Sequence, residues 1–281
     1  MPEGPEVATS RDSLRKLVVN NQLKSISIHA GRYLRKMPEG WADFLEDSKQ
    51  TRFTIGAVDT KGKFMWWTLK TASQTWWMWC THGMSGQWTT QKPDKNTAVV
   101  VWVDVDGSGL LSINFRDPRR FGTIKFVNDP DVHAKKLASL GPCVLSQASQ
   151  VTPGLFEKKM RCKPGRTIAE ALLDQSGVSG VGNYIKCEAL WAARIGPWRS
   201  VDDITPNEYK ILCESVLKIA KDSYTSQGAT IKSYKTIDGS TGSAQFAFQM
   251  YGKKAGACGH AVRRETTADK RTSWWCTWCQ K

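Results

Sequence analysis

The sequence lacks a long apolar run and a regular cysteine framework, and these absences exclude several classes of protein. No apolar stretch approaches the roughly 18 residues of a membrane span. The opening, MPEGPEV, lacks the charged and apolar regions of a secretory leader. The 8 cysteines are too scattered for a disulfide framework in a chain of 281 residues. We therefore expect a cytoplasmic or nuclear protein (nucleoid-associated if bacterial) with reduced thiols, neither secreted nor membrane-bound.

Acidic residues are also in short supply. Lys and Arg total 40 against 26 Asp and Glu, which gives a formal net charge of +14. A surplus of this size is typical of a protein that binds a polyanion, because Lys and Arg contacts to phosphates release condensed counterions. A basic surface kept only for solubility is the alternative. The charge indicates a class of partner and says nothing about chemistry.

Tryptophan, in contrast, is abundant, and several of the 13 residues are clustered. Trp66-Trp67 and Trp76-Trp77 lie in β-like runs, where bulky aromatic side chains mostly fill a core. Stacking on nucleic-acid bases is the alternative use of such rings. The pattern favours the core, and no single Trp is given a function.

Apolar spacing divides the chain into a β-rich half and a helical half. A helical pattern over residues 8–19 precedes strand-like segments that are separated by turn-forming residues. These segments are 23–29, 63–69, 74–80, 97–105, 110–114 and 123–127. Strands without intervening helices predict an antiparallel sandwich or barrel. Helical spacing follows at 168–173, 185–192 and 209–220, before a short β-like tail.

The predicted fold is therefore a multidomain α+β protein without internal repeats. Residues 1–130 are expected to form an antiparallel β-sandwich with flanking helices, and residues 131–230 a helical domain. Residues 231–281 are expected to form a small finger built on a β-hairpin. A chain of this length is sufficient for two modest domains.

Pro2 is a candidate nucleophile. Methionine aminopeptidase removes Met1 when the next residue is small, which would leave Pro2 with a free secondary amine. An α-amino group titrates near pKa 7.7–8.0, so a useful fraction is unprotonated at neutral pH. Such an amine attacks C1′ of a nucleotide sugar to form an iminium, and Glu3 is placed to act as general acid. An incidental Pro-Glu start is the alternative.

The tail contains a candidate metal site. Cys258 and His260 are followed after fifteen residues by Cys276 and Cys279, and such groupings usually bind tetrahedral zinc. The Cys-x-His spacing is one residue tighter than usual. An alternative alignment makes Cys258 the second ligand and leaves Ala255, which cannot bind metal, in the first position. A hairpin that folds without zinc is the remaining alternative.

Several motifs resemble those of one enzyme family. They are MPEGPEV at 1–7, TKGKF at 60–64, HGMSG at 82–86, RDPRRFG at 116–122, LLDQ at 172–175 and GVGNY at 180–184. Together they resemble the formamidopyrimidine-DNA glycosylase/endonuclease VIII family, in which the second-residue proline is the nucleophile and the next glutamate the general acid. The resemblance extends from Pro2 to Cys279 and implies a helix–two-turn–helix element in the helical half.

The resemblance implies roles for seven further residues. Glu6 would contact the flipped nucleotide, and Lys63 the phosphate beside the lesion, as an active-site lysine. Met84, Arg119 and Phe121 would enter the duplex where the damaged base has left. An apolar wedge restores stacking there, and a guanidinium bonds to the orphaned partner base. Asn183 and the finger-tip Arg271 would grip phosphates at the lesion.

The implied function is that of a bifunctional DNA glycosylase/AP lyase of base-excision repair. It would release oxidised bases (pyrimidines, hydantoins, and 8-oxoguanine or formamidopyrimidines as further candidates) through a Schiff base and nick DNA by β,δ-elimination. We expect a monomer acting on double-stranded DNA, with single-stranded DNA as a further candidate, and one structural zinc ion without a catalytic cofactor. A non-catalytic reader of damaged DNA on the same fold is the chief rival. A general zinc-finger DNA-binding protein would not explain the N-terminal match.

The preferred lesion divides the two branches of the family. The set Met84, Arg119 and Phe121 resembles the formamidopyrimidine branch, whereas PEGPE and GNY resemble the endonuclease VIII branch, which the sequence favours. Residues 246–252, after a Gly/Ser-rich stretch at 238–243, are expected to hold a loop that caps the flipped base.

Overall fold

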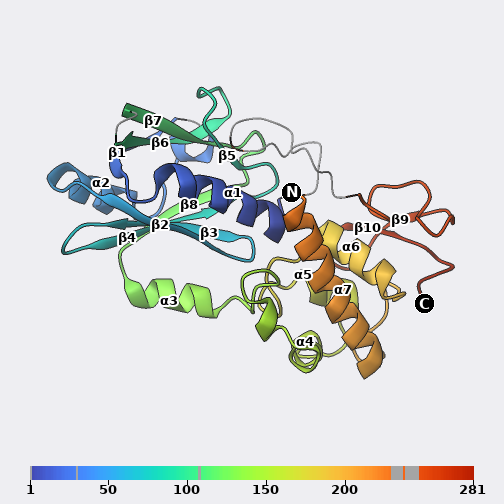
Figure 1. Ribbon diagram of the computed structural model, residues 1–281. Coiled ribbons are helices and arrows are strands. Elements are labelled where there is room, and N and C mark those ends of the chain that lie inside the picture. The colour runs from blue at the N-terminus through green and yellow to red at the C-terminus, as the bar shows by residue number, and fades with distance from the viewer. Residues whose placement is uncertain (1, 30, 107–108, 229–236, 238–246) are drawn as a thin grey trace. The chain divides into compact units, whose positions relative to one another are not determined.

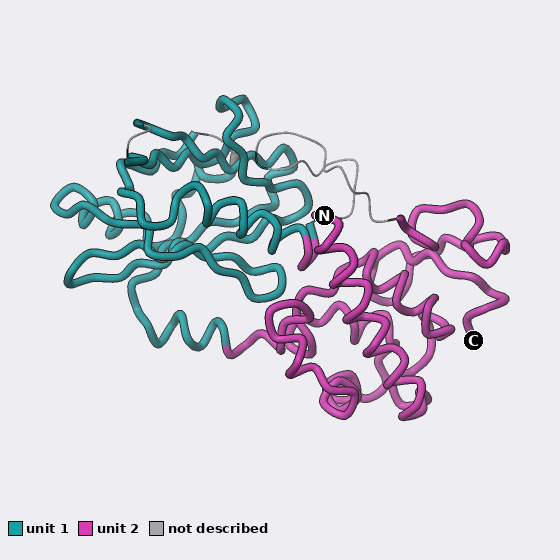
Figure 2. Tube along the Cα trace, in the orientation of Figure 1, with its two compact units in different colours: residues 1–2, 6–137, 230–243 teal, residues 3–5, 138–229, 244–281 magenta. Residues whose placement is uncertain are grey.

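The computed structural model describes residues 2–29, 31–106, 109–228, 237 and 247–281 (Figure 1). The chain divides into two compact units (Figure 2). Unit 1 comprises residues 1–2, 6–137 and 230–243, and unit 2 comprises residues 3–5, 138–229 and 244–281. Within the described ranges, no helix has both the length and the apolar character that a membrane crossing requires.

Unit 1 is built on antiparallel strands in the order β5-β7-β6-β1-β2-β3-β4-β8. They are β1 (Gln22–Ile28), β2 (Thr54–Lys61), β3 (Phe64–Lys70), β4 (Thr75–Thr81), β5 (Gln87–Thr89), β6 (Thr97–Val105), β7 (Gly109–Arg116) and β8 (Thr123–Val127). β1 and β2 share the single residue pair Gln22–Thr54, whereas β3 and β4 pair over their whole length. The sheet therefore separates there into two layers, which confirms the expected β-sandwich.

Helices accompany the sandwich as expected. They are α1 (Gly4–Val18), the 3-10 turn η1 (Gly31–Leu34), α2 (Trp41–Gln50) and α3 (Pro130–Ala138). α1 contributes Leu14 and Val18 to the core, both fully buried, and α2 contributes Phe44. The prediction missed α2, because Phe44 is its single buried side chain and ten residues with one buried position carry little periodicity.

The tryptophan-rich strands fill the core and also cover its back. Burial alternates along β4, so that Trp76, Met78 and Cys80 point inward and are at most 2% exposed. On the opposite face, the Trp77 ring stacks on His133 of α3 at 4.6 Å between ring centroids. The core assignment is confirmed for Trp76, and Trp77 is half-buried under α3.

Unit 2 contains the expected helical domain. Its elements are η2 (Ala148–Gln150), α4 (Pro153–Met160), α5 (Ile168–Leu173), α6 (Asn183–Ala192), α7 (Pro206–Thr225), and the strands β9 (Arg263–Thr266) and β10 (Thr272–Trp275). Thr205 caps α7 through a reciprocal pair of bonds with Glu208, and Pro206 follows at the first helical position. β9 and β10 pair antiparallel, which confirms the expected hairpin.

Two sequence expectations need correction. The first helix begins at Gly4 rather than residue 8, and the Gly4 N–H donates to the Gly180 carbonyl at 2.9 Å. Lys63 does not begin a strand: it lies in the β2–β3 turn, after Gly62 at a φ of 59°. A positive φ is a conformation that glycine adopts without steric cost, which explains the Lys-Gly pair at this turn.

Candidate active site and nucleic-acid interface

The Glu3 carboxyl group lies at the N-terminus of α6. Its oxygens accept hydrogen bonds from the backbone N–H groups of Tyr184 at 2.8 Å and Ile185 at 3.3 Å. The first N–H groups of a helix have no partner within the helix, and the helix dipole favours a negative group at this end. Glu3 is 2% exposed, so the helix supplies the hydrogen bonds that water cannot.

Gly182 makes this approach possible. A Cβ atom built on Gly182 would lie 2.1 Å from the carboxyl carbon of Glu3 and 2.5 Å from one of its oxygens. The φ of Gly182 is −127°, so the glycine is needed here for space and not for its backbone conformation. Gly182 precedes α6 and occupies its N-cap position.

Gln175 organises the turn that leads into α6. Its side-chain amide donates to the carbonyls of Leu173 and Val181, and its side-chain oxygen accepts the Gly180 N–H at 3.0 Å. The Gly180 carbonyl in turn accepts from Gly4. The LLDQ and GVGNY segments therefore form one hydrogen-bonded turn, and this turn anchors the first residues of the chain.

Pro2 and Glu6 flank the Glu3 anchor in sequence. Pro2 is buried, and Glu6 is fully buried in the first turn of α1. Met1 lies outside the described residues, so its removal stays a prediction. Lys63 is half-buried in the β2–β3 turn of unit 1.

The two predicted wedge loops lie side by side in unit 1. The Ser85 hydroxyl donates to Asp117 at 2.6 Å and accepts the Arg119 N–H at 3.0 Å. The second oxygen of Asp117 accepts the Gly122 N–H at 2.6 Å, which closes the loop from 117 to 122. The loops that carry Met84 and the pair Arg119 and Phe121 are thus hydrogen-bonded to each other.

The wedge residues project from this base. Phe121 is 55% exposed, an unusual state for a large apolar ring, and the Arg119 guanidinium lies 5.3 Å from its centroid. Met84 is half-buried. A Cβ atom on Gly83 would lie 2.6 Å from the Phe121 backbone, so this glycine lets the loops approach. The two loops that carry the predicted wedge residues therefore lie in close contact, with Phe121 exposed at the tip.

His82 supports the wedge from inside. It is 3% exposed, packs edge-on against Phe115, and neither of its ring nitrogens has a hydrogen-bond partner among the described residues. Burial lowers the pKa of His82 to about 4, so the ring is neutral at physiological pH. The ring therefore acts as a packing element beneath the loop.

Asn183 and Arg271 come together in unit 2. Asn183 opens α6, and its side-chain amide donates to the Thr272 carbonyl at 2.8 Å. Arg271 precedes β10, at the turn of the β9–β10 hairpin. Its own N–H donates to Asp269 at 2.9 Å. The contact to Thr272 joins the finger tip to the start of α6 and brings the two predicted phosphate-binding residues into one region.

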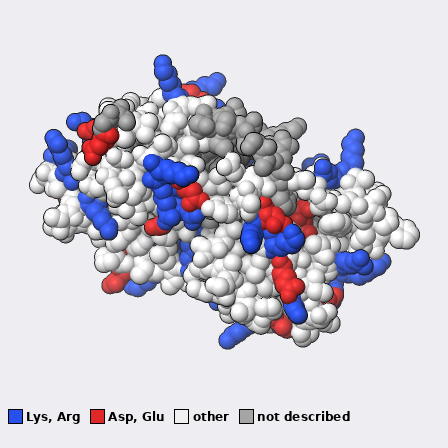
Figure 3. All heavy atoms as spheres, viewed as in Figure 1, with Lys and Arg blue, Asp and Glu red and all other residues white. Residues whose placement is uncertain are grey.

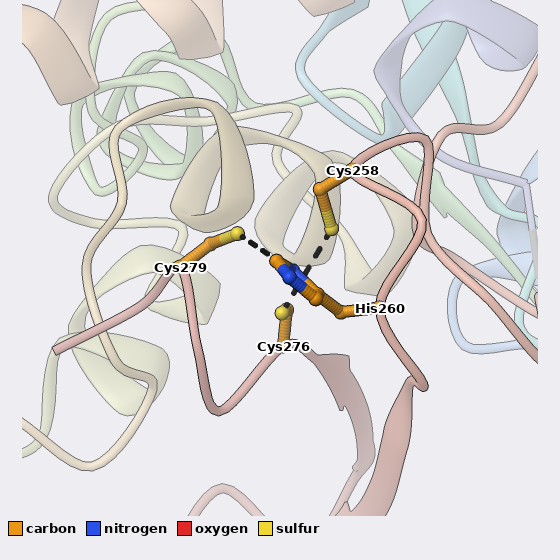
Figure 4. Close-up of side chains that lie close together, drawn as sticks. All are labelled: Cys258, His260, Cys276 and Cys279. Atoms are coloured by element: carbon orange, nitrogen blue, oxygen red, sulfur yellow. Dashed lines mark hydrogen bonds between the residues drawn. The ribbon is translucent and has the colours of Figure 1, made fainter.

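The four predicted metal ligands form a cluster (Figure 4). The ligand atoms of Cys258, His260, Cys276 and Cys279 all lie within 4.8 Å of one another. The Cys258 and Cys276 sulfurs are 3.8 Å apart, and the Cys279 sulfur is 3.5 Å from Nδ1 of His260. Ligands around tetrahedral zinc are separated by roughly 3.5–3.8 Å, given Zn–S near 2.3 Å and Zn–N near 2.0 Å. The donor set and its spacing fit a structural metal ion.

Glu188 of α6 was not singled out from the sequence. It is 2% exposed, and its carboxylate accepts the backbone N–H groups of Gln249, Met250 and Tyr251 at 2.7–3.0 Å. It therefore anchors the chain where it re-enters unit 2. The Gly/Ser-rich stretch at 238–243 and residue 246 of the expected capping segment 246–252 lie outside the described residues, so the capping role stays a prediction. A lone helical glutamate gives no sequence signal for such an anchor.

Basic side chains are spread over the face shown in Figure 3. Lys and Arg lie over both units on this face, with Asp and Glu among them, and do not gather into one patch. On this face, therefore, the distribution of charge does not by itself mark where a polyanion binds.

Two family models match the chain. The model described as the formamidopyrimidine-DNA glycosylase N-terminal domain matches residues 1–124, and the model described as the formamidopyrimidine-DNA glycosylase H2TH domain matches residues 140–235. The formamidopyrimidine-DNA glycosylase of Ligilactobacillus salivarius is 31% identical over 288 residues, covering 100% of this chain and 99% of that protein. That of Saccharophagus degradans is 27% identical, with both chains fully covered.

Solved structures agree with these matches. The MutM (Fpg) protein of Thermus thermophilus aligns with a TM-score of 0.81 and 29% identity, over 99% of this chain and 98% of that one. Lactococcus lactis Fpg in complex with DNA containing an abasic site aligns with a TM-score of 0.83 and 25% identity, over 99% of each chain.

We expect Gly182→Ala to destabilise unit 2, because the added Cβ would displace Glu3 and leave two buried N–H groups of α6 without partners. The cost should be roughly 2–4 kcal/mol, measured as the free energy of unfolding in urea. Gly154→Ala is the matched control, since a Cβ there meets nothing within 4 Å. Equal stability of the two variants would show that Glu3 does not require this gap.

Proposed function

The chain belongs to the formamidopyrimidine-DNA glycosylase family, and from this premise we propose that it is a bifunctional DNA glycosylase/AP lyase that excises oxidised bases during base-excision repair. The observation that carries the proposal is that Glu3, the residue after Pro2, is anchored at the N-terminus of α6. A chain terminus usually frays, and here the residue after the terminal amine is held by a buried helix.

Pro2 is the proposed nucleophile. Its unprotonated amine attacks C1′ of the damaged nucleotide, the bond from C1′ to the base breaks, and the base leaves with a proton. The bond from C1′ to the ring oxygen then breaks, and the oxygen stays on the sugar as a hydroxyl. This ring opening gives an iminium between Pro2 and C1′. The iminium acidifies the C2′ hydrogen, so removal of that proton expels the 3′-phosphate. A second elimination expels the 5′-phosphate and leaves a single-nucleotide gap.

Glu3 is the proposed general acid, which delivers a proton to the sugar ring oxygen as the ring opens. The two N–H groups of α6 fix its carboxyl group, so little reorganisation is needed when the sugar arrives. Glu6 is proposed to contact the flipped nucleotide and Lys63 the phosphate beside the lesion. Both assignments rest on the motif resemblance.

The paired loops are the proposed wedge. Phe121 and Met84 would fill the gap left by the flipped base, and Arg119 would bond to the orphaned partner base. The exposure of Phe121 and the bonds from Ser85 to Asp117 and Arg119 support this role. Loops that insert a side chain into duplex DNA must keep their shape, and the hydrogen bonds of Ser85 and Asp117 hold these two loops together.

Asn183 and Arg271 are proposed to bind phosphates at the lesion. The start of a helix offers N–H groups to an anion, and Arg271 adds a positive charge. We further propose that Cys258, His260, Cys276 and Cys279 hold a zinc ion, which would fix the hairpin that carries Arg271. We also propose a monomer that binds double-stranded DNA and acts in the cytoplasm, at the nucleoid if bacterial, or in a nucleus.

The branch within the family is a finer proposal. PEGPE and GNY favour the endonuclease VIII-like side, whereas the relatives described above carry the name of the formamidopyrimidine enzyme. Oxidised pyrimidines, hydantoins, 8-oxoguanine and formamidopyrimidines are therefore the candidate substrates, and a lesion series decides among them.

We expect borohydride to trap the protein on duplexes that carry an abasic site, a hydantoin, thymine glycol or 8-oxoguanine, because it reduces the iminium to a stable amine. The tag must be C-terminal, and the protein must begin at Pro2. A matched protein with an N-terminal extension should give no adduct, since its Pro2 nitrogen is an amide. Failure to trap on every lesion would favour a non-catalytic reader of damaged DNA.

Metal analysis should find about one zinc ion per chain, as expected for one tetrahedral site. Cys276→Ser should lower the zinc content and weaken binding to abasic-site DNA, because the hairpin loses its anchor. Cys162→Ser, at an exposed cysteine outside the cluster, is the control. A zinc-free protein that binds DNA as tightly as the wild type would contradict the structural role of the metal.

A further inference from the structure

An ion pair is buried beneath the finger tip. The Lys186 ammonium lies 2.5 Å from a carboxylate oxygen of Asp269, and the two side chains are 0% and 3% exposed. Lys186 belongs to α6, and Asp269 belongs to the turn between β9 and β10. The other ion pairs found among the described residues include at least one partly exposed partner, such as Lys218 and Asp222 at 74% and 44%.

The second oxygen of Asp269 builds the turn itself. Oδ1 accepts the Thr267 hydroxyl at 2.6 Å and the Arg271 backbone N–H at 2.9 Å. The Thr267 N–H donates to the Arg271 carbonyl at 3.0 Å, which closes the loop around Lys270 at a φ of 58°. Both oxygens of Asp269 are therefore used: one shapes the turn and the other holds it against α6.

Stability alone does not explain why this ion pair is buried. Removing two charges from water costs several kcal/mol per ion, and well-packed apolar residues are often as stabilising as a buried pair. A buried ion pair can instead serve to select one conformation of the segments that it joins. The geometry fixed here is the position of Arg271 relative to the start of α6, where Asn183 lies.

We propose that Lys186 and Asp269 are positioning residues that hold Arg271 in place for the lesion phosphate. This inference rests on the proposed function and deepens it. Asp269 orients the Arg271 backbone, and Lys186 neutralises the Asp269 charge. Without Lys186, the Asp269 carboxylate would leave an unpaired negative charge beside the residue that is proposed to bind phosphate. Asn183 at the start of α6 also holds the hairpin, through its hydrogen bond to the Thr272 carbonyl.

A double-mutant cycle tests whether Asp269 acts through Arg271. The readout is the Kd for a duplex carrying tetrahydrofuran, a stable abasic-site analogue, measured over a range of salt concentrations. We expect Arg271→Ala to weaken binding by roughly 10- to 100-fold, the effect of one charge-assisted phosphate bond, and Asp269→Ala by about 10-fold. The double variant should bind within about two-fold of Arg271→Ala alone, because Asp269 has nothing left to position.

The salt dependence gives a second readout that a general loss of stability would not change. Loss of one phosphate contact should reduce the slope of log K against log salt by about 0.9 in Asp269→Ala. Lys186→Met removes the α6 partner of Asp269 and tests the same positioning role. If Asp269→Ala does not fold, Asp269→Asn replaces it, because the Asn side-chain oxygen can still accept the hydrogen bonds of the turn. Lys218→Met removes one exposed positive charge on α7 and is the matched control for Lys186→Met.

Full additivity of Asp269→Ala and Arg271→Ala, or an unchanged salt slope in Asp269→Ala, would overturn the positioning role. Wild-type behaviour of Lys186→Met, indistinguishable from Lys218→Met, would do the same. These results leave the proposed function intact as long as wild-type protein binds the duplex and is trapped by borohydride on abasic-site DNA. Absence of both in the wild type would overturn the proposed function itself.

Discussion

The hydrogen bonds from the N-terminus of α6 to the Glu3 carboxyl group are the interaction on which the site depends. They make residues 3–5, which lie close to the chain start and would otherwise fray, a fixed part of unit 2. The bonds require a gap at Gly182, and the turn that supplies this gap is shaped by Gln175. The unpaired N–H groups of α6, the space at Gly182 and the carboxyl group of Glu3 therefore depend on one another, although Glu3 lies far from the other two in sequence.

The same helix start also organises the rest of unit 2. Asn183, its first residue, reaches the finger hairpin, and Lys186, one turn later, reaches the finger tip. Glu188 anchors the returning chain at residues 249–251. α6 therefore presents three polar side chains within its first two turns, each to a different segment. In unit 1 the bonds between Ser85, Asp117 and Arg119 play a comparable role for the wedge loops.

Local patterns were sufficient to predict much of this arrangement. Alternation along β4 and the spacing of the four metal ligands depend on near neighbours, and the structure agrees with both. Helical spacing at 185–192 predicted most of α6, which begins two residues earlier, at Asn183. The family resemblance supplied the rest of the candidate site, including Met84 and Phe121, and no local pattern indicates that Phe121 is exposed.

What the sequence could not reveal are contacts between distant segments. The pairing of Glu188 with residues 249–251 spans about sixty positions, and Lys186 with Asp269 spans 83. Single charged residues in a helix are more often solvated, so neither gave a signal. α2 was missed because one buried ring defines it, and Lys63 was misplaced by one residue because Gly62 sets the turn.

The central claim is that the terminal amine of Pro2 bonds to the damaged sugar. The most direct test is to digest the borohydride-trapped complex and identify the modified peptide by mass spectrometry. The account predicts that the sugar remnant is attached to the nitrogen of Pro2 in a peptide that lacks Met1. A remnant on the side chain of Lys63, or on any other lysine, would contradict it.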